Sequence, residues 1–269
     1  MRNGEIVLVG DVHGAYDTLS RGLHPDDTLI IAGDTLTFMD FDDFSKAILF
    51  MAFTADELAE GLKELAAGNL DRIREAFREI TTPGEDKYER MLPKITAEYT
   101  ALANSLPDDA YIIYGNDDYP AVMKQILDGR GHIVESGVIE LSGRRIGMVS
   151  GLPSGPRTIG FPGELSREEY DGRIDSLGPV DVIITHTPPA DDELTFDVIP
   201  KRNEASSTAL LEYILANKPA YAFYGHVHNP KVPRKRIGET EAINLGFFKK
   251  RKILTRLNLE TMTIREVEI

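Results

Sequence analysis

Short apolar runs recur along the chain, and polar residues or glycine bound each of them. Five of these runs have the length and composition of buried strands. They cover residues 6–9, 28–32, 110–114, 181–185 and 220–224. Between the runs the apolar residues fall at helical spacing, which predicts amphipathic helices. These predicted helices cover residues 15–23, 120–127, 167–177 and 206–216. Strands that alternate with helices in this way predict an α/β fold.

The other stretches carry shorter patterns. Residues 138–141 and 145–150 flank Ser142-Gly143 and predict a hairpin. Residues 154–163 form a loop rich in glycine and proline. Two alternating stretches near the end predict short strands over residues 253–257 and 263–267. Neither a repeat nor a flexible linker divides the chain, so we expect one domain over residues 1–269.

The segment over residues 36–106 has little strand character and is longer than a crossover between parallel strands requires. Helical spacing predicts two to four amphipathic helices, one of which Pro93 kinks or interrupts. We interpret the segment as a helical insertion that caps a site or forms a subunit contact. Four of its residues could line a pocket, with core packing as the alternative: Phe38, Met39, Phe41 and Phe44. A further apolar stripe is interpreted as packing: Leu58, Leu62 and Leu65.

Composition narrows the function classes. With 42% hydrophobic and 28% charged residues, the chain resembles ordinary globular proteins. Its net charge of −14 and pI of about 4.9 disfavour binding to long nucleic acid, which needs a basic face. The basic run Lys249-Lys250-Arg251-Lys252 is interpreted as a solvated turn. No segment is apolar enough to span a bilayer and no apolar stretch precedes the first strand, so we expect a cytoplasmic protein.

Side chains that can bind metals follow all five predicted strands. They are Asp11, His13, Asp34, Asn116, His186, His226 and His228. Open α/β sheets bind their ligands at the carboxyl ends of the strands. A lone histidine at a strand end is usually structural, but five such ends favour a shared metal site. Because the chain has no cysteine, its ligands are nitrogen and oxygen atoms. Seven ligands exceed what one cation with open positions needs, so two cations that share a carboxylate fit better.

The same motifs carry a resemblance to a known family. They are Asp11-Val12-His13-Gly14, Gly33-Asp34, Gly115-Asn116, His186 and Gly225-His226-Val227-His228. In this order and context they resemble the calcineurin-like metallophosphoesterases. Two further motifs, His186-Thr187-Pro188-Pro189 and Ile243-Asn244-Leu245-Gly246, resemble the Icc-related branch of predicted phosphoesterases.

The resemblance implies a fold and a metal centre. The fold would be a two-sheet sandwich flanked by helices, in the layer order α-β-β-α. Two divalent transition-metal ions (Mn, Fe, Zn, Co or Ni) would bind at the strand ends, and a hydroxide between them would be the nucleophile. Asp34 would bridge the two ions. The resemblance assigns Asp11, His13, Asp34 and His228 to one ion, and Asp34, Asn116, His186 and His226 to the other.

The chain departs from the family pattern at Asp117. Many members have a histidine there, which is interpreted as the general acid for the leaving group. A model aspartate titrates near 3.9 and a model histidine near 6.5, so an ionised Asp117 has no proton to donate. We therefore hypothesise that Asp117 limits turnover on poor leaving groups. The alternative is that Asp117 points away from the site and that only Asp118 has a structural role.

Some charged residues have two interpretations. Arg157, Lys201 and Arg202 could contact a substrate phosphate, and surface solvation is the alternative. His24 and His132 lie outside the motifs and are interpreted as incidental.

Together these features predict a metal-dependent phosphoesterase. Its catalytic residues would include Asp34, Asn116 and Asp117. Because the usual acid is missing, we expect a phosphodiester rather than a monoester substrate, small or nucleotide-like, with a cyclic nucleotide as one option. The alternative function is a binding or scaffold protein on the same fold. A nuclease would need a basic surface that the chain lacks. A homo-oligomer remains open.

Overall fold

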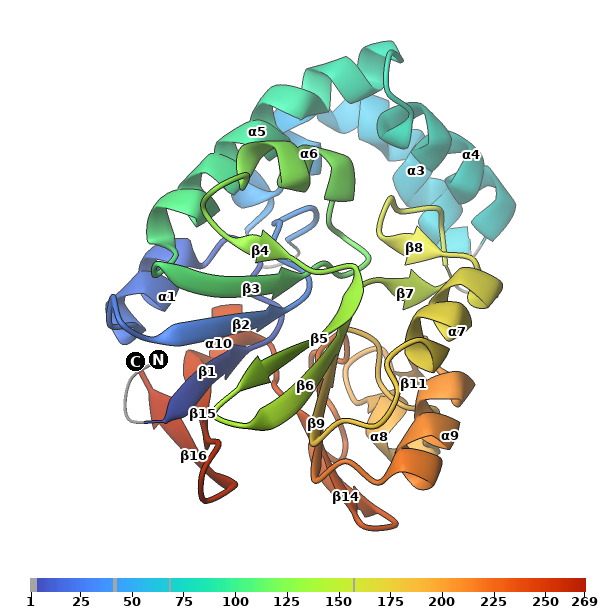
Figure 1. The fold of residues 1–269 in the computed structure, drawn as a ribbon. Helices are drawn as coiled ribbons and strands as arrows, with labels where there is room; N and C mark the ends of the chain where they lie inside the picture. Colours follow the sequence, from blue (N-terminus) through green and yellow to red (C-terminus); the bar gives the residue numbers. More distant parts are fainter. Residues whose placement is uncertain (1–3, 41–42, 68, 157) are drawn as a thin grey trace.

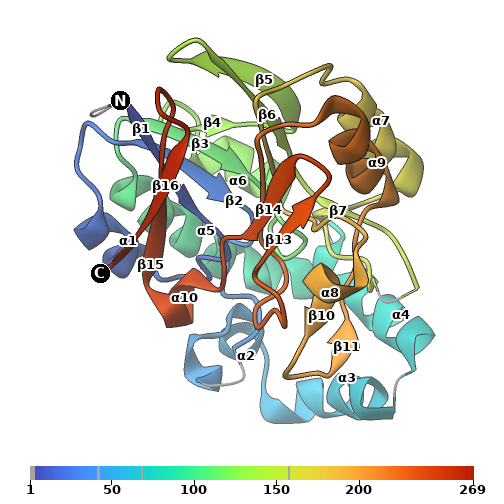
Figure 2. The same ribbon diagram turned by 90° about the horizontal axis from the view of Figure 1, so that it is seen from below.

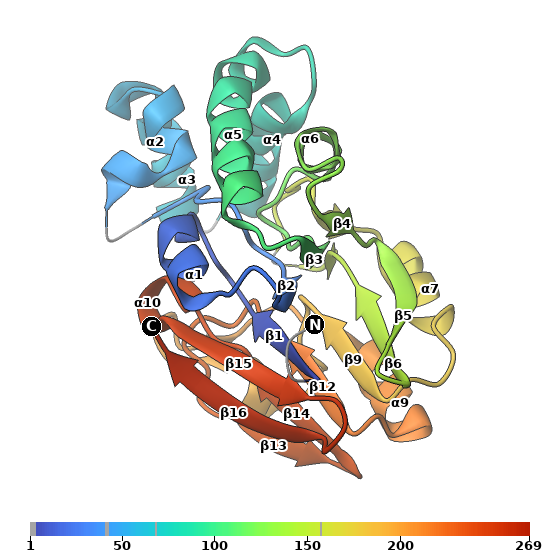
Figure 3. The same ribbon diagram turned by 60° about the vertical axis from the view of Figure 1, so that its left-hand side comes forward.

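Two six-stranded sheets lie face to face at the centre of the computed structural model, which describes residues 4–40, 43–67, 69–156 and 158–269 (Figures 1 and 3). The first sheet has the order β16-β15-β1-β2-β3-β4, and β1 to β4 run parallel. Its strands are β1 (Glu5–Val9), β2 (Thr28–Ala32), β3 (Asp109–Ile113), β4 (His132–Ile133), β15 (Ile253–Asn258) and β16 (Thr263–Glu268).

The second sheet has the order β13-β14-β12-β9-β6-β5. Its four inner strands are parallel and both edge strands are antiparallel to their neighbours. The strands are β5 (Ser136–Leu141), β6 (Arg144–Val149), β9 (Val182–Thr185), β12 (Tyr221–Tyr224), β13 (Arg234–Ile237) and β14 (Thr240–Asn244). The predicted hairpin around Ser142-Gly143 is confirmed as β5 and β6.

Helices cover the outer face of each sheet, which completes the predicted α-β-β-α layering (Figure 3). On the first sheet lie α1 (Tyr16–Gly22), α5 (Asp86–Ser105) and α6 (Pro120–Ile126). On the second lie α7 (Arg167–Asp175) and α9 (Thr208–Asn217). Both α7 and α9 begin at a serine whose hydroxyl accepts a hydrogen bond from a backbone N–H of the first turn, as good N-caps do.

The alternation within β1 explains why its apolar run is continuous. Ile6 and Leu8 pack between the two sheets, whereas Val7 and Val9 pack against the helices. All four side chains are buried, because this strand has apolar layers on both faces. The strand therefore ends in the interior, and the residues that follow it enter the space between the layers.

Several short elements were not predicted by the apolar pattern, because each is only two to four residues long. Two small sheets form, from β7 (Leu152–Pro153) with β8 (Glu164–Leu165) and from β10 (Phe196–Asp197) with β11 (Arg202–Asn203). Two one-turn helices are α8 (Asp192–Thr195) and α10 (Phe248–Arg251).

Between β2 and β3 the chain forms the predicted helices. After a short 3-10 turn, η1 (Phe44–Lys46), they are α2 (Ile48–Ala52), α3 (Ala55–Ala67), α4 (Leu70–Thr81) and α5. Pro93 does not interrupt α5, which continues to Ser105. Its loss of one backbone hydrogen bond is offset because Met91, Ile95 and Tyr99 are buried along the same helix.

Phe38, which follows β2, packs into the core. Phe38 is fully buried, and its ring lies 4.8 Å from Phe161 and 5.9 Å from Phe77, between ring centres. Met39 and Leu58 are partly buried against the same core. Phe41 and the side chains of Phe44, Leu62 and Leu65 lie outside the described residues.

Candidate metal centre

Four of the seven predicted ligands lie on strained turns at the strand ends. Asp11, His13, Asp34 and His226 all have positive φ angles, of 46°, 41°, 39° and 69°. This left-handed conformation costs a residue with a side chain about 1–3 kcal/mol and is often found at functional sites. The His13 N–H donates to the Asp34 carbonyl at 3.1 Å, which joins the turns after β1 and β2. The turns therefore hold the side chains of two strands against each other.

Glycines next to the ligands leave room for them. A Cβ atom at Gly33 would lie 2.2 Å from Nδ1 of His186, and one at Gly115 would lie 2.1 Å from Oδ1 of Asp34. Neither gap could hold a carbon atom, so a ligand side chain from the end of another strand occupies the space beside each glycine.

One group of candidate ligands gathers between β1, β2 and the turn after β12. Asp11, His13, Asp34 and His228 each place a nitrogen or oxygen atom within 4.8 Å of the others. Within the group, Nε2 of His13 lies 3.2 Å from Nε2 of His228 and 3.9 Å from Oδ2 of Asp34.

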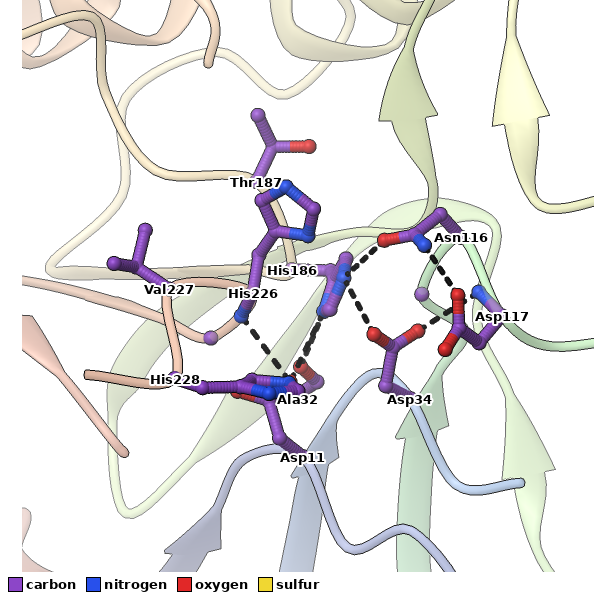
Figure 4. A network of polar contacts seen from close by, with 12 residues as sticks. Asp11, Ala32, Asp34, Asn116, Asp117, His186, Thr187, His226, Val227 and His228 are labelled. Atoms are coloured by element: carbon purple, nitrogen blue, oxygen red, sulfur yellow. Dashed lines mark hydrogen bonds and ion pairs between the residues drawn. The ribbon is translucent and has the colours of Figure 1, made fainter. Parts of the chain in front are cut away.

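A second group shares Asp34 with the first. Asp34, His186 and His226 also have candidate ligand atoms within 4.8 Å of one another. Nε2 of His186 lies 3.4 Å from Oδ2 of Asp34 and 3.1 Å from Oδ1 of Asn116, so Asn116 joins this group (Figure 4). The structure thus brings all seven predicted ligands together, with Asp34 between the two groups.

Backbone carbonyls fix the orientation of two imidazoles. Nδ1 of His13 donates to the Leu36 carbonyl at 2.7 Å, and Nδ1 of His186 donates to the Ala32 carbonyl at 3.1 Å. A proton held at Nδ1 leaves the Nε2 lone pair free to face the cluster, as in most metal-binding histidines.

Two buried atoms of the cluster lack a hydrogen-bond partner among the described residues. They are Oδ2 of Asp11 and Nε2 of His226. An unpaired polar atom in the interior costs about 1–3 kcal/mol. Asp11 belongs to one ligand group and His226 to the other, so a cation in each group would compensate one of these atoms. The donor set also fits, because imidazole nitrogens and carboxylate oxygens suit divalent transition metals.

The protein groups alone shift one another's pKa values. Burial lowers the pKa of His226 to about 3, and burial also lowers the pKa values of His13 and His228. Burial opposes protonation of His186, but Asp34 and Asp11 outweigh it and raise its pKa to about 10. Burial raises the pKa of Asp11 to about 8. Three of the four imidazoles are therefore neutral near pH 7, which is the form that binds metals.

Asp117 lies within the cluster and does not point away from it. Its carboxylate Oδ1 accepts a hydrogen bond from Nδ2 of Asn116 at 2.5 Å, and its N–H donates to Oδ1 of Asp34 at 2.9 Å (Figure 4). Without bound metal ions, burial and then the Asp34 carboxylate raise the pKa of Asp117 well above its usual range.

Asp118 has the structural role that its position suggested. Its wholly buried carboxylate accepts hydrogen bonds from Thr35 Oγ1 at 2.6 Å and from the Gly115 N–H at 2.9 Å. It thereby joins the turn after β3 to the turn that carries Asp34.

α5, the last helix of the predicted insertion, supports the turns that carry the candidate ligands. The sequence did not reveal this role. Oε2 of Glu98 accepts hydrogen bonds from the Thr37 N–H and the Tyr16 hydroxyl, both at 3.0 Å. The Tyr99 hydroxyl accepts from the Tyr119 N–H at 2.7 Å. Neither residue lies near a ligand in sequence, so no local pattern marks them.

The basic run near the end of the chain was interpreted as a solvated turn, and Lys250, Arg251 and Lys252 are exposed. It forms most of α10, and Lys249 pairs with Asp40 at 2.7 Å. Lys250 and Arg251 line a pocket together with His228. The motif Ile243-Asn244-Leu245-Gly246 lies just before α10. It was a feature of the sequence that could have indicated that α10 lies close to His228.

Two of the three predicted phosphate contacts, Lys201 and Arg202, lie among the described residues. Arg202 pairs with Glu204 at 3.0 Å, although its charge also contributes to lowering the pKa of His226. Lys201 is exposed, and Arg157 lies outside the described residues. Of the two incidental histidines, His132 stacks on Tyr111 and His24 pairs with Asp26 at the surface.

A profile of the calcineurin-like phosphoesterase family matches residues 4–230. The chain belongs to this family. It is therefore a metal-dependent phosphoesterase, and the predicted family is confirmed. None of the described helices has the length and apolar character that crossing a membrane requires.

Solved structures agree on the fold. One crystal structure aligns with 16% identity over 98% of each chain and a TM-score of 0.65. The structure of TT1561 from Thermus thermophilus aligns with 11% identity over 98% of each chain and a TM-score of 0.56. A search of curated proteins finds no match.

Proposed function

We propose that this phosphoesterase uses two divalent transition-metal ions to hydrolyse small phosphodiesters. The observation that carries the proposal is the pair of buried ligand groups that share Asp34. In the proposed arrangement Asp11, His13, Asp34 and His228 hold one ion, and Asp34, Asn116, His186 and His226 hold the other. Such a pair of ions stabilises charge on the phosphoryl oxygens and supplies a nucleophile at neutral pH. Any of Mn, Fe, Zn, Co or Ni suits these ligands.

The chain's own residues hold this arrangement rigid. The Leu36 and Ala32 carbonyls fix the rings of His13 and His186, and Asp118 fixes the turn that carries Asp34. Ligands held this way need little reorganisation when a substrate binds, which favours catalysis by positioning.

Asp117 acts on Asn116 rather than as the general acid. An ionised carboxylate only accepts hydrogen bonds, so the contact of 2.5 Å requires the amide nitrogen of Asn116 to face Asp117. The amide oxygen then faces His186 and the proposed second ion. Nearby cations would keep Asp117 ionised, so it has no proton for a leaving group.

Because position 117 lacks the family's usual histidine, a phosphodiester with a good leaving group is the proposed substrate, with a monoester as the alternative. The net charge of −14 supports a small or nucleotide-like substrate over long nucleic acid. A cytoplasmic location and a homo-oligomer remain predictions from the sequence.

Metal analysis combined with an activity assay tests the proposal. The purified protein should hold two ions per chain and hydrolyse bis(p-nitrophenyl) phosphate when Mn²⁺ is added. Because Asp34 serves both groups, Asp34→Asn should lose metal at both positions and lower turnover at least about 100-fold. The exposed Asp128 offers a matched control, since Asp128→Asn removes the same charge away from the cluster. A protein that binds both ions and hydrolyses neither diesters nor monoesters would instead be a binding or scaffold protein.

A further inference from the structure

A pocket of about 270 Å³ opens beside the candidate metal centre. His228 forms one part of its wall, so the pocket borders the first ligand group directly. Other parts of the wall come from Pro230 and Pro233 on the loop after β12 and from α10. Figure 2 shows α10 next to the start of β15, on the chain segment that leaves β14.

Phe247 joins the pocket to the metal centre. Its ring stacks on His228 with 4.2 Å between the ring centres and an angle of 12° between the planes. Its ring also meets His13 edge-on at 5.3 Å. Two proposed ligands of one ion thus contact this ring, and the ring also lines the pocket.

The pocket has two cationic side chains and no acidic one among its described lining residues. Nζ of Lys250 lies 5.8 Å from the centre of the Phe247 ring. The guanidinium of Arg251 packs on Gly246, where an added Cβ would lie 2.4 Å from Nη1. Arg251 is exposed and makes no side-chain hydrogen bond or ion pair with the described residues, so its donors are available to a ligand.

The charge of the lining residues indicates which kind of ligand this pocket favours. A phosphodiester is an anion, and a chain of net charge −14 repels it at long range. Two cations beside the metal centre counteract this repulsion locally and favour the binding of a negatively charged group. A terminal phosphate carries about −1.5 to −2 charges near pH 7, so it gains more from two cations than a carboxylate does.

Building on the proposed activity, we propose that Lys250 and Arg251 bind a second, terminal phosphate of the substrate. The substrate class is then phosphodiesters that carry a phosphate monoester apart from the scissile bond. Phe247 supplies the apolar surface between the two phosphates, against which a sugar or a base can pack.

A matched pair of substrates tests this assignment. Thymidine 5′-(p-nitrophenyl phosphate) and its 3′-phosphorylated form differ only in a terminal phosphate, and both release p-nitrophenol. We expect the protein to prefer the phosphorylated form in kcat/KM by about tenfold or more, because the added contacts are charge-assisted hydrogen bonds. The preference should arise mainly in KM and should weaken with added salt.

Variants without the two positive charges test whether the substrate preference arises in this pocket. The double variant Lys250→Gln with Arg251→Gln should bring the ratio of the two kcat/KM values close to one. Lys252→Gln removes one charge from the neighbouring exposed residue, which is not part of the pocket wall, and should keep the original ratio. An unchanged ratio in the double variant would overturn the phosphate site and leave the proposed phosphodiesterase activity standing.

A binding measurement separates the two proposals if hydrolysis fails. Thymidine 3′,5′-bisphosphate is titrated calorimetrically into metal-free protein, which requires no turnover. Binding that weakens about tenfold or more in the double variant, and not in Lys252→Gln, supports the site even if the proposed activity is wrong. Equal affinity in all three proteins, or the absence of binding to any of them, overturns the site.

Discussion

The side-chain amide of Asn116 donates a hydrogen bond of 2.5 Å to the carboxylate of Asp117, the next residue in the chain. The amide oxygen of Asn116 lies 3.1 Å from Nε2 of His186 on the other side. The residue that replaces the family's usual histidine is thus placed to orient a neighbour that we propose as a metal ligand.

This contact predicts a metal-binding defect without loss of the fold. Asp117→Ala should weaken the binding of one ion about 10–100-fold, which is the usual effect of removing a residue that orients a ligand. Asp117→Asn should recover part of the affinity, because its amide oxygen still accepts a hydrogen bond. Calorimetric titration with Mn²⁺ measures both constants, and the exposed Asp108→Ala is the control. Equal affinities in all these proteins would rule out the orienting role.

Placing the family's histidine at position 117 should change how the rate of hydrolysis depends on the leaving group. Asp117→His adds a group that titrates near pH 6.5 and can donate a proton. Alkyl phosphodiesters need that proton more than aryl phosphodiesters, so the ratio of aryl to alkyl rates should fall. The rates are compared at fixed metal occupancy, because Asp117 also supports Asn116. A ratio that stays the same would show that Asp117 does not limit turnover on poor leaving groups.

The raised pKa of Glu98 predicts that the free energy of unfolding depends on pH. Burial raises its pKa above the ordinary 4.5, against the hydrogen bond from Thr37. The folded protein therefore holds this proton more tightly than the unfolded chain. Its contribution to the free energy of unfolding is retained below pH 4.5 and is lost as the pH rises through the higher folded value.

Glu98→Gln removes this titration. The unfolding free energies of the variant and of the original protein are measured in urea at a series of pH values. The difference between them should shift in favour of the variant as the pH rises above 4.5. Glu89→Gln on the same helix is the control, because Glu89 is exposed. If the difference between the two proteins does not vary with pH, the proton on Glu98 does not affect stability.

Phe38 links the insertion to the rest of the protein. Its ring contacts Phe77 of α4 and Phe161 of the loop before β8, and it is fully buried. Phe38→Ala should lower the free energy of unfolding by about 3–5 kcal/mol. The exposed Met51→Ala should cost far less, and equal losses in urea denaturation would contradict the packing described here.

The parts of the fold that depend on local pattern were predictable. The runs that form β1, β2, β3, β9 and β12 are mostly buried on both faces, so their sequences are mostly apolar. The ligands were predictable for the same reason, since each directly follows such a strand. β13 lies at the edge of the second sheet and β14 lies beside it, and their mixed sequences gave no comparable signal.

What could not be predicted depends on contacts between distant segments. Phe247 meets His13 from the far end of the chain, and Glu98 reaches the turn after β2 from inside the insertion. The positive φ angles of Asp11 and Asp34 also require the assembled sheets, because isolated residues of this type avoid that conformation. The roles of such residues can be recognised only in the folded structure.

The crowded glycines at 33 and 115 constrain how the protein can diverge. Since any side chain there would collide with His186 or Asp34, neither position can accept another residue while the centre is kept. Sequence change is more easily accepted at exposed positions around the centre, such as Lys250 and Arg251 on α10. The same chemical core can then acquire new substrates by altering only its surroundings.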